Sequence, residues 1–176
     1  MKREETAPNP LVERRRVMLM VDLAGFTRAV AGLGPIDLAA LVHRFYSLAG
    51  DAIESAGGTV VKFVGDGCLS VFDETDAVAA VACARDMRAP VHTLGREFAV
   101  DLEVGANVHL SVVVEGDYGS GASRAHDIVG PGVIHTYRMG SGAGIRISEP
   151  VYRKLPNDQR GAWTKRQPPA TYTLSA

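Results

Sequence analysis

A short segment, Val60–Phe72, constrains the fold of this chain more than any other. It reads VVKFVGDGCLSVF, two apolar runs on either side of Gly65-Asp66-Gly67. This pattern is typical of a β-hairpin, because glycine and aspartate tolerate the backbone angles of a tight turn. Asp66 lies at the tip and Lys62 interrupts the first strand. Taken alone, one is an ordinary turn residue and the other an edge-strand charge, so the rest of the chain must decide their function.

The segments around the hairpin alternate between strand and helix patterns. Short apolar runs predict strands, and apolar residues that recur every three or four positions predict helices with one buried face. In chain order we predict a strand over Arg16–Leu23, a helix from Pro35 to Ala56, the hairpin, a helix over Glu74–Ala89 that ends at Pro90, and strands over Phe98–Gly116. This β-α-β-β-α-β order is that of a ferredoxin-like kernel, so the predicted fold class is α+β.

The rest of the chain adds elements to this kernel. Asp117–Ala125 is rich in glycine and serine and is predicted to be a loop. We then predict a helix over Gly132–Met139, a strand over Gly144–Ser148, a helix over Glu149–Leu155 and a last hairpin over Ala162–Leu174. The 176 residues have the length of one domain, which we assign to residues 13–176. Residues 1–12 are charged and contain prolines, so we expect a flexible arm there.

Composition argues against several classes of function. The net charge of −1 gives no reason to expect binding to nucleic acid or to an anionic membrane. The charged N-terminus lacks the apolar core of a secretory signal, and no apolar run is long enough to span a bilayer. Cys68 and Cys83 lie within apolar segments and are expected to be buried free thiols. We therefore expect a cytoplasmic protein without a membrane segment.

Two predicted strands end in carboxylates. Asp22 closes the first strand and Asp66 lies at the hairpin tip. Because the kernel can place a strand end beside a hairpin tip, the pair could bind hard divalent cations and leave coordination sites for phosphates. Gly25, Phe26 and Thr27 follow in a small-residue turn that enters a helix, where exposed backbone N–H groups form an anion cradle. We expect these three residues to contact a metal-bound polyphosphate substrate.

Three motifs then resemble the catalytic domain of class III nucleotidyl cyclases. They are ERRRVMLMVDLAGFT, GGTVVKFVGDGCLSVF and HDIVGPGVIHTYRM, and the resemblance extends from Glu13 to the C-terminus. It implies a head-to-tail homodimer that binds a nucleoside triphosphate at its interface. It also implies that Asp22, Leu23 and Asp66 hold two divalent cations, Mg²⁺ or Mn²⁺. One ion would lower the pKa of the ribose 3′-hydroxyl, and the other would hold the triphosphate.

Three more residues match functional positions of the family. Lys62 matches the lysine that donates to a ring nitrogen of adenine, and Asp127 matches the aspartate that accepts from its 6-amino group. Guanine has an acceptor at that position and mismatches the pair, so ATP is the expected substrate and cyclic AMP the product. Arg138 matches the arginine that neutralises charge near the α-phosphate in the transition state.

The third motif departs from the family at its ribose-binding asparagine. Ile134 stands at that position and cannot hydrogen-bond the ribose ring oxygen. His135 is adjacent, but one residue along a helix turns a side chain by about 100°, so it could substitute only if the backbone shifted. Losing one transition-state donor typically costs about two to three decades in rate. We keep both positions as uncertain members of the site and expect an enzyme of low activity.

The segment after this motif is short and rich in glycine. The family's triphosphate-binding lysine would fall near Gly144, so it is absent here. Arg146 is close but is expected to point to the opposite face of a regular strand. Arg124 is another candidate, and Lys165 and Arg166 are expected to be solvated.

These departures leave other functions open. One is a catalytically impaired homologue that binds nucleotides or regulates another protein. Another is a cyclase for GTP or for a pyrimidine nucleotide, as in the cyclases of phage defence. A third is a ferredoxin-like binding module without nucleotide chemistry. Metal-dependent nucleotide binding would separate the first two from the third.

Overall fold

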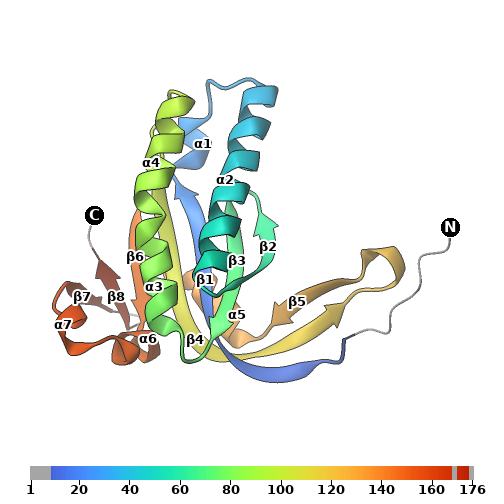
Figure 1. The fold of residues 1–176 in the computed structure, drawn as a ribbon, viewed down its shortest axis with the longest axis vertical. Helices are drawn as coiled ribbons and strands as arrows, with labels where there is room; N and C mark the ends of the chain where they lie inside the picture. The colour runs from blue at the N-terminus through green and yellow to red at the C-terminus, as the bar shows by residue number, and fades with distance from the viewer. Residues whose placement is uncertain (1–8, 168–169, 175–176) are drawn as a thin grey trace.

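The computed structural model describes residues 9–167 and 170–174 (Figure 1). Its kernel consists of β1 (Val12–Ala24), α2 (Pro35–Ser55), β2 (Thr59–Val64), β3 (Gly67–Asp73), α3 (Ala77–Asp86), α4 (Arg88–Glu97) and β4 (Glu103–Tyr118). The strands stand in the order β2-β3-β1-β4, and β1 is antiparallel to both of its neighbours. This is the ferredoxin-like βαββαβ arrangement, so the predicted α+β fold class is confirmed.

The chain contains further helices and strands outside this kernel. They are α1 (Phe26–Ala29), the 3₁₀ turn η1 (Gly121–Ser123), β5 (Ala125–Val129), α5 (Pro131–Arg138), β6 (Gly144–Ser148), α6 (Glu149–Lys154), α7 (Asn157–Arg160), β7 (Trp163–Arg166) and β8 (Thr171–Leu174). Strand β6 runs parallel to β4, and the antiparallel hairpin of β7 and β8 continues the sheet beyond β6. The predicted C-terminal helix and strands are therefore present.

The segment around Pro90 differs from the prediction. Helix α3 ends at Asp86, and Pro90 lies in the first turn of a separate helix, α4. Proline is tolerated there because the N–H groups of a first turn have no partner within the helix. The helix predicted to end at Pro90 is thus two helices, and the strands predicted over Phe98–Gly116 are the single strand β4.

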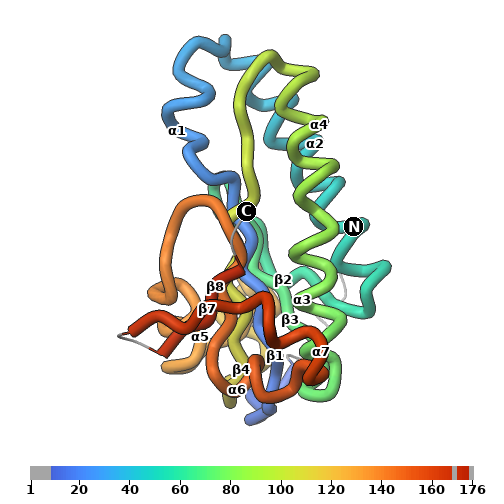
Figure 2. The backbone as a smooth tube through the Cα atoms, turned by 90° about the vertical axis from the view of Figure 1, so that its left-hand side faces the viewer, coloured from blue at the N-terminus to red at the C-terminus, as the bar shows by residue number. Residues whose placement is uncertain are grey.

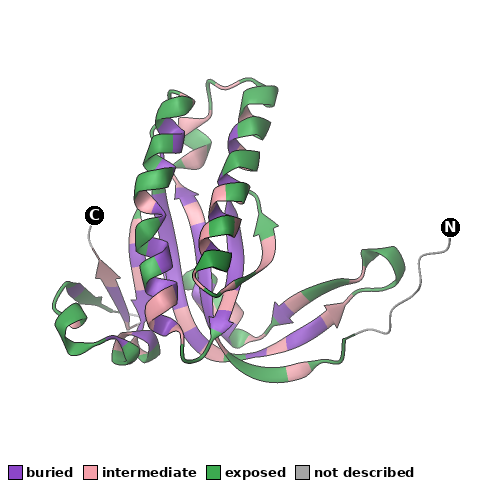
Figure 3. Ribbon diagram, in the orientation of Figure 1, coloured by how far each residue is buried: buried purple, intermediate pink, exposed green. Residues whose placement is uncertain are grey.

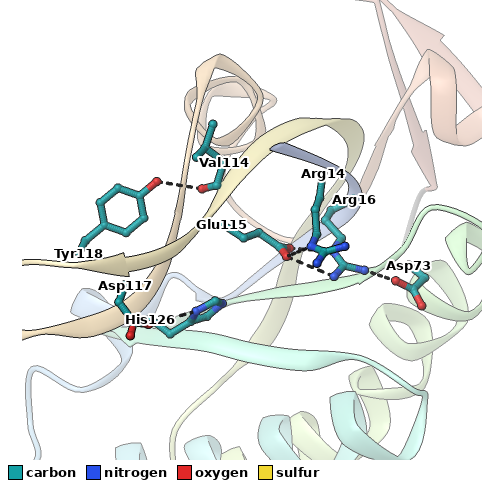
Figure 4. A network of polar contacts seen from close by, with 8 residues as sticks. All are labelled: Arg14, Arg16, Asp73, Val114, Glu115, Asp117, Tyr118 and His126. Atoms are coloured by element: carbon teal, nitrogen blue, oxygen red, sulfur yellow. Dashed lines mark hydrogen bonds and ion pairs between the residues drawn. The ribbon is translucent and has the colours of Figure 1, made fainter. Parts of the chain in front are cut away.

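The loop predicted over Asp117–Ala125 is the tip of a two-stranded arm, in which only Asp117, Tyr118 and Ala125 lie in strands. Strand β4 continues to Tyr118 and pairs with β5, and the two strands project from the sheet (Figure 1). Arg14 and Arg16 of β1 form ion pairs with Glu115 of β4, which hold the arm to β1 (Figure 4). The hydrophobic pattern missed β5 because Ile128 is the one buried residue of this short strand.

The predicted N-terminal arm lies partly outside the described residues, which begin at Asn9. The Asn9 backbone N–H donates to the Asp117 carboxylate at 2.9 Å. The division into residues 1–12 and 13–176 stays a prediction. In the part of the chain that the structure describes, no helix combines the length and the apolar character needed to cross a bilayer.

The two faces of the sheet carry different clusters of apolar residues. Helices α2, α3 and α4 cover one face and bury the main core, with Leu19 and Val21 of β1 inside it (Figures 2 and 3). The other face, which we call the α5 face, carries a smaller cluster that includes Met18 and Met20. Because side chains alternate along a strand, Asp22 emerges on the α5 face with these methionines. The face with the thinner cover therefore carries the candidate site.

The two cysteines lie within the main core. Cys68 of β3 and Cys83 of α3 are buried free thiols, as predicted. Burial is the largest of the effects that raise the pKa of both thiols, to about 12 for Cys68 and about 11 for Cys83. Both therefore stay protonated at neutral pH.

Candidate active site

Main-chain pairing brings together the two aspartates predicted to bind metal. Asp22 of β1 lies opposite Gly67 of β3, the residue that follows Asp66. The N–H of Leu23 donates to the Asp66 carbonyl oxygen at 3.1 Å, which ties the hairpin turn to the end of β1. The Leu23 side chain is buried in the main core. The strand end and the hairpin tip therefore lie side by side.

The Asp22 carboxylate fills a slot whose walls are backbone. A Cβ added at Gly105 would lie 2.0 Å from Asp22 Oδ1 and 2.8 Å from the Gly142 carbonyl oxygen. Oδ1 is buried and has no hydrogen-bond partner among the described residues. Burial and the charge of Asp66 raise the pKa of Asp22 to about 6, and Arg146 acts in the opposite direction. A cation would stabilise a buried carboxylate in this setting.

Arg146 borders this slot, and the prediction that it points away is wrong. Its neighbours Ile145 and Ile147 point into the main core, so Arg146 lies on the α5 face, as Asp22 does. Its guanidinium folds back over the glycine-rich turn before β6 and donates to the carbonyl oxygens of Gly142 at 2.9 Å and Ala143 at 3.2 Å. Arg146 thus places a positive charge near the carboxylates of Asp22 and Asp66.

A pocket of about 550 Å³ lies beside the turn after β1, and its lining includes Gly25, Arg28 and Glu103. Gly25 adopts a φ of 75°, and its carbonyl oxygen accepts the first two hydrogen bonds of α1. Phe26 packs against the main core, whereas Thr27 is exposed. At these predicted substrate positions, a ligand can therefore reach the backbone and Thr27.

A β-bulge directs Lys62 towards Asp127. Val60 pairs with Ser70 and Lys62 pairs with Leu69, so β2 has one extra residue between the two pairs. In a regular strand Lys62 would share the helix-covered face with Val60, and the bulge turns it to the α5 face. Its Nζ donates to the two Oδ atoms of Asp127 at 2.7 and 2.9 Å. The two residues expected to recognise the base form an ion pair within one chain.

Helix α5 carries the predicted transition-state and ribose positions on its outer side. Ile134 and Arg138 are one turn apart and both exposed, Ile134 to 58%. His135 instead packs against His109 of β4, with ring centroids 4.5 Å apart. Burial and the neighbouring His135 lower the pKa of His109 to about 4, so His109 is neutral at pH 7. His135 therefore belongs to the contact between helix and sheet.

Side chains of β4 fix where α5 lies. Asn107 Nδ2 donates to the carbonyl oxygens of Thr136 at 3.0 Å and Gly140 at 2.9 Å, at the end of the helix. A Cβ added at Gly132 would lie 2.6 Å from Ser111 Oγ, so glycine lets the helix approach the sheet closely. The position of the exposed side of α5 thus follows from its packing on β4.

The other basic candidates lie in different parts of the fold. Arg124 follows η1 in the connection between β4 and β5. Lys165 and Arg166 are exposed on β7, the edge strand beyond β6 and β8, and Lys165 Nζ lies 5.5 Å from the centroid of the Tyr172 ring. These positions fit the prediction that the tail residues are solvated.

Comparison with curated proteins finds relatives named as cyclases. An adenylate cyclase of Anabaena cylindrica is 26% identical over 155 residues, which are 81% of this chain and 31% of that protein. An adenylate cyclase of Streptomyces coelicolor is 33% identical over 72 residues, which are 41% of this chain and 19% of that protein. No family model matches the chain.

Solved structures share the fold over nearly the whole chain. The guanylyl cyclase Cya2 superposes with a TM-score of 0.83 at 26% identity and covers 93% of both chains. The adenylyl cyclase CyaB from P. aeruginosa superposes with a TM-score of 0.82 at 20% identity, over 95% of this chain and 96% of that chain. In sequence and in fold, this chain is therefore similar to class III nucleotidyl cyclase catalytic domains, which supports the predicted resemblance.

The chain spans only a part of its curated relatives, 31% of the Anabaena protein and 19% of the Streptomyces protein. The names of the similar proteins include both adenylyl and guanylyl cyclases. A choice of nucleotide must therefore be argued from the residues of this chain.

Sequence analysis missed two residues that shape the candidate site. Gly105 leaves room for the Asp22 carboxylate, and Asn107 holds the end of α5. A lone glycine inside a strand pattern signals a close approach of other atoms, and this signal was present in EVGANVHL. Asn107 was detectable only as a polar residue in an apolar strand.

Proposed function

We propose that this domain converts ATP into 3′,5′-cyclic AMP and pyrophosphate. The ion pair of Lys62 and Asp127 carries the proposal, because it sets a donor beside an acceptor on the α5 face. Adenine offers the complementary groups, a ring nitrogen that accepts and a 6-amino group that donates. Guanine offers an oxygen acceptor and a ring N–H donor at the same two places, which leaves both protein groups mismatched.

We also propose that Asp22 and Asp66 hold two divalent cations, Mg²⁺ or Mn²⁺. The buried, unpartnered Oδ1 of Asp22 and the neighbouring carboxylate suit hard ions that prefer oxygen ligands. Within residues 9–167 and 170–174, no cluster of three or more His, Cys, Asp or Glu side chains is placed to hold a metal. Phosphate, water and backbone oxygens would complete the coordination. When bound, the cations would neutralise the triphosphate and lower the pKa of the ribose 3′-hydroxyl.

In this mechanism the residues of the chain position the reactants. Lys62 and Asp127 orient the base, and Arg138 neutralises the charge that develops at the α-phosphate. The 3′-hydroxyl gives its proton to water, its oxygen attacks the α-phosphorus in line, and the bond from the α-phosphorus to the oxygen that bridges it to the β-phosphorus breaks. Pyrophosphate leaves with the electron pair of that bond. The contribution of the protein is mostly positioning and charge neutralisation.

We propose that two copies build each site. Large apolar side chains are exposed on and around the α5 face, which is typical of a protein interface. They are Val129, Ile134 and Tyr137. In a head-to-tail homodimer, one protomer would supply the carboxylate pair and its partner would supply the base pair and the arginine. Two equivalent sites would result.

A second candidate function is a nucleotide-binding homologue with little or no cyclase activity. Ile134 favours it, because its side chain offers no hydrogen bond at the ribose-binding position of the family. A cyclase for GTP is a third candidate, since the guanylyl cyclase Cya2 has the same fold. The pairing of Lys62 with Asp127 argues against GTP.

A product assay tests these candidates. The purified protein is incubated with Mn²⁺ or Mg²⁺ and with ATP, GTP, CTP or UTP in turn, and products are identified by mass. We expect cyclic AMP, and we expect Asp66→Ala to lose it. A cyclic product from another nucleotide would contradict the assignment of the base pair. No cyclic product from any nucleotide would favour the impaired homologue.

A further inference from the structure

One residue of α2 touches the hairpin next to both of its functional side chains. Tyr46 Oη donates to the Gly65 carbonyl oxygen at 2.6 Å. The Tyr46 ring stacks on Phe63, with centroids 4.1 Å apart and planes 18° from parallel. Gly65 precedes Asp66 in the chain, and Phe63 follows Lys62. A single tyrosine therefore contacts the hairpin at two points, one beside the metal-binding carboxylate and one beside the base-binding lysine.

The hairpin turn needs such support because much of it is open to solvent. Phe63, Val64 and Gly65 are exposed, and Gly65 has a φ of 59°. From β1, the Leu23 N–H holds the Asp66 carbonyl oxygen at 3.1 Å. From α2, the Tyr46 hydroxyl holds the preceding carbonyl oxygen. Two consecutive carbonyl groups of the turn are thus fixed from two different elements.

The stacking of Tyr46 on Phe63 holds strand β2 in place. Phe63 pairs with Cys68, which belongs to the main core, so Phe63 faces α2 while the bulge turns Lys62 to the α5 face. Holding Phe63 from α2 keeps β2 in the bulged register that directs Lys62 towards Asp127. Helix α2 spans 21 residues and packs on the sheet through Leu41, Phe45, Ala49 and Ile53, so it is a rigid support.

We propose that Tyr46 is a positioning residue for two functional side chains of its own chain, which belong to different sites of the proposed homodimer. Its hydroxyl fixes the turn that carries Asp66, and its ring fixes the strand that carries Lys62. The inference rests on the proposed function of these side chains and extends it to the helix-covered side of the sheet. Functional side chains held by packed neighbours keep their geometry better than those on a free loop.

Two variants separate the two contacts. Tyr46→Phe removes the hydroxyl and keeps the ring, and Phe63→Leu removes the stacking and keeps the hydroxyl. Tyr152→Phe is the matched control, because Tyr152 also stacks on an aromatic ring, that of Tyr172 at 3.8 Å, in a different part of the fold. Binding of Mn²⁺ is measured from the free ion by electron paramagnetic resonance, with a non-cyclisable ATP analogue present. Amide hydrogen exchange at the turn is measured without metal.

Tyr46→Phe is expected to weaken Mn²⁺ binding by roughly three- to tenfold, the effect of one net hydrogen bond, and to speed exchange at Asp66 and Gly67. Phe63→Leu is expected to lower the preference for ATP over GTP more than it weakens Mn²⁺ binding. Tyr152→Phe should match the wild type in all three measurements.

The outcomes distinguish this inference from the proposed function. If the wild type binds Mn²⁺ and Asp66→Ala does not, but Tyr46→Phe binds and exchanges like the wild type, the role of Tyr46 is wrong. If the wild type itself binds no Mn²⁺, the proposed function fails. Exchange at the turn in the metal-free protein then still decides whether Tyr46 positions it.

Discussion

The two ends of the candidate site are built in different ways. At the carboxylate end, the pairing of β1 with β3 sets Asp22 beside Asp66, and Gly105 leaves room for the carboxylate. At the α5 end, Ile134 and Arg138 stand on the outer side of a helix of eight residues. The first end is enclosed by the backbone of its own chain. The side chains of the second end are exposed to solvent.

This difference determines how each end responds to substitution. A slot with backbone walls has no space for an added atom, because backbone cannot move aside as a flexible side chain can. An exposed helix position accepts almost any side chain without loss of the fold. The family asparagine could therefore be replaced by Ile134 at no cost in stability, whereas the carboxylate end could not change in the same way. We expect large effects at the first end and small ones at the second.

The largest effect is expected from Gly105→Ala. The new Cβ would lie 2.0 Å from Asp22 Oδ1 and would force the carboxylate out of its slot. Because metal ions contribute several kcal/mol of transition-state stabilisation, we expect cyclic nucleotide production to fall by at least about 100-fold. Product formation at saturating Mn²⁺ checks this. Gly161→Ala is the control, since nothing lies within 4 Å of its added Cβ. If the activity of Gly105→Ala is within threefold of that control, the slot is not needed for activity.

A smaller effect is expected from Asp127→Ala, which leaves Lys62 without its partner. Loss of one partner of a hydrogen-bonded pair costs about 1–3 kcal/mol, so the ratio of kcat/KM for ATP to that for GTP should fall roughly 5- to 150-fold. Steady-state kinetics with the two nucleotides measures this ratio. Glu149→Ala breaks the exposed ion pair with Arg153 and should leave the ratio unchanged. An unchanged ratio in Asp127→Ala would remove the argument for adenine.

The carboxylate end was also the more predictable end from sequence. Apolar runs flanking Asp22 and Asp66 indicate strands, and strand pairing then brings the two carboxylates together. The pattern did not reveal the bulge that turns Lys62, because an extra residue between Val60 and Lys62 leaves the run apolar.

Local sequence patterns did not predict two other features, the two-stranded arm and the conformation of the Arg146 side chain. The arm of β4 and β5 is held by ion pairs such as that of Arg16 with Glu115, and charged pairs carry no hydrophobic period. The face that carries Arg146 follows from strand alternation, but periodicity does not encode how its side chain folds over the turn before β6. Contacts between distant segments decide the first feature, and side-chain contacts within one turn decide the second.

A modest gain is expected from Ile134→Asn. If the exposed outer side of α5 meets the ribose in a homodimer, one restored hydrogen bond worth about 1 kcal/mol should raise kcat/KM for ATP roughly fivefold. This is less than the roughly two to three decades typical of a fully preorganised donor, because the surrounding side chains have not been adjusted to the new amide. Ile36→Asn is the matched control, because Ile36 is 82% exposed on α2. Both variants should keep the free energy of unfolding within about 0.5 kcal/mol of the wild type. Equal or lower activity in Ile134→Asn would indicate that this domain binds the ribose without that position.

The smallest expected effect is a change in the folding stability of the metal-free protein with pH, caused by Asp22. The pKa of Asp22 is raised in the folded chain, from its ordinary 3.8 to about 6, chiefly by burial and then by Asp66. Between these two values the folded state binds a proton that the unfolded state does not, so stability increases as the pH falls through 6 towards 4. The gain is lost as the pH rises again through the folded pKa.

Asp22→Asn isolates this contribution, because it cannot titrate. In chelator, the midpoint of thermal unfolding of the wild type should rise relative to that of Asp22→Asn when the pH is lowered from 7 to 5, by a few degrees. Saturating Mn²⁺ should abolish the difference, since a bound cation takes the place of the proton. A wild type that instead loses stability relative to the variant at pH 5 would mean that Asp22 is held ionised without metal. Arg146, whose positive charge lowers the pKa of Asp22, would then be the residue responsible.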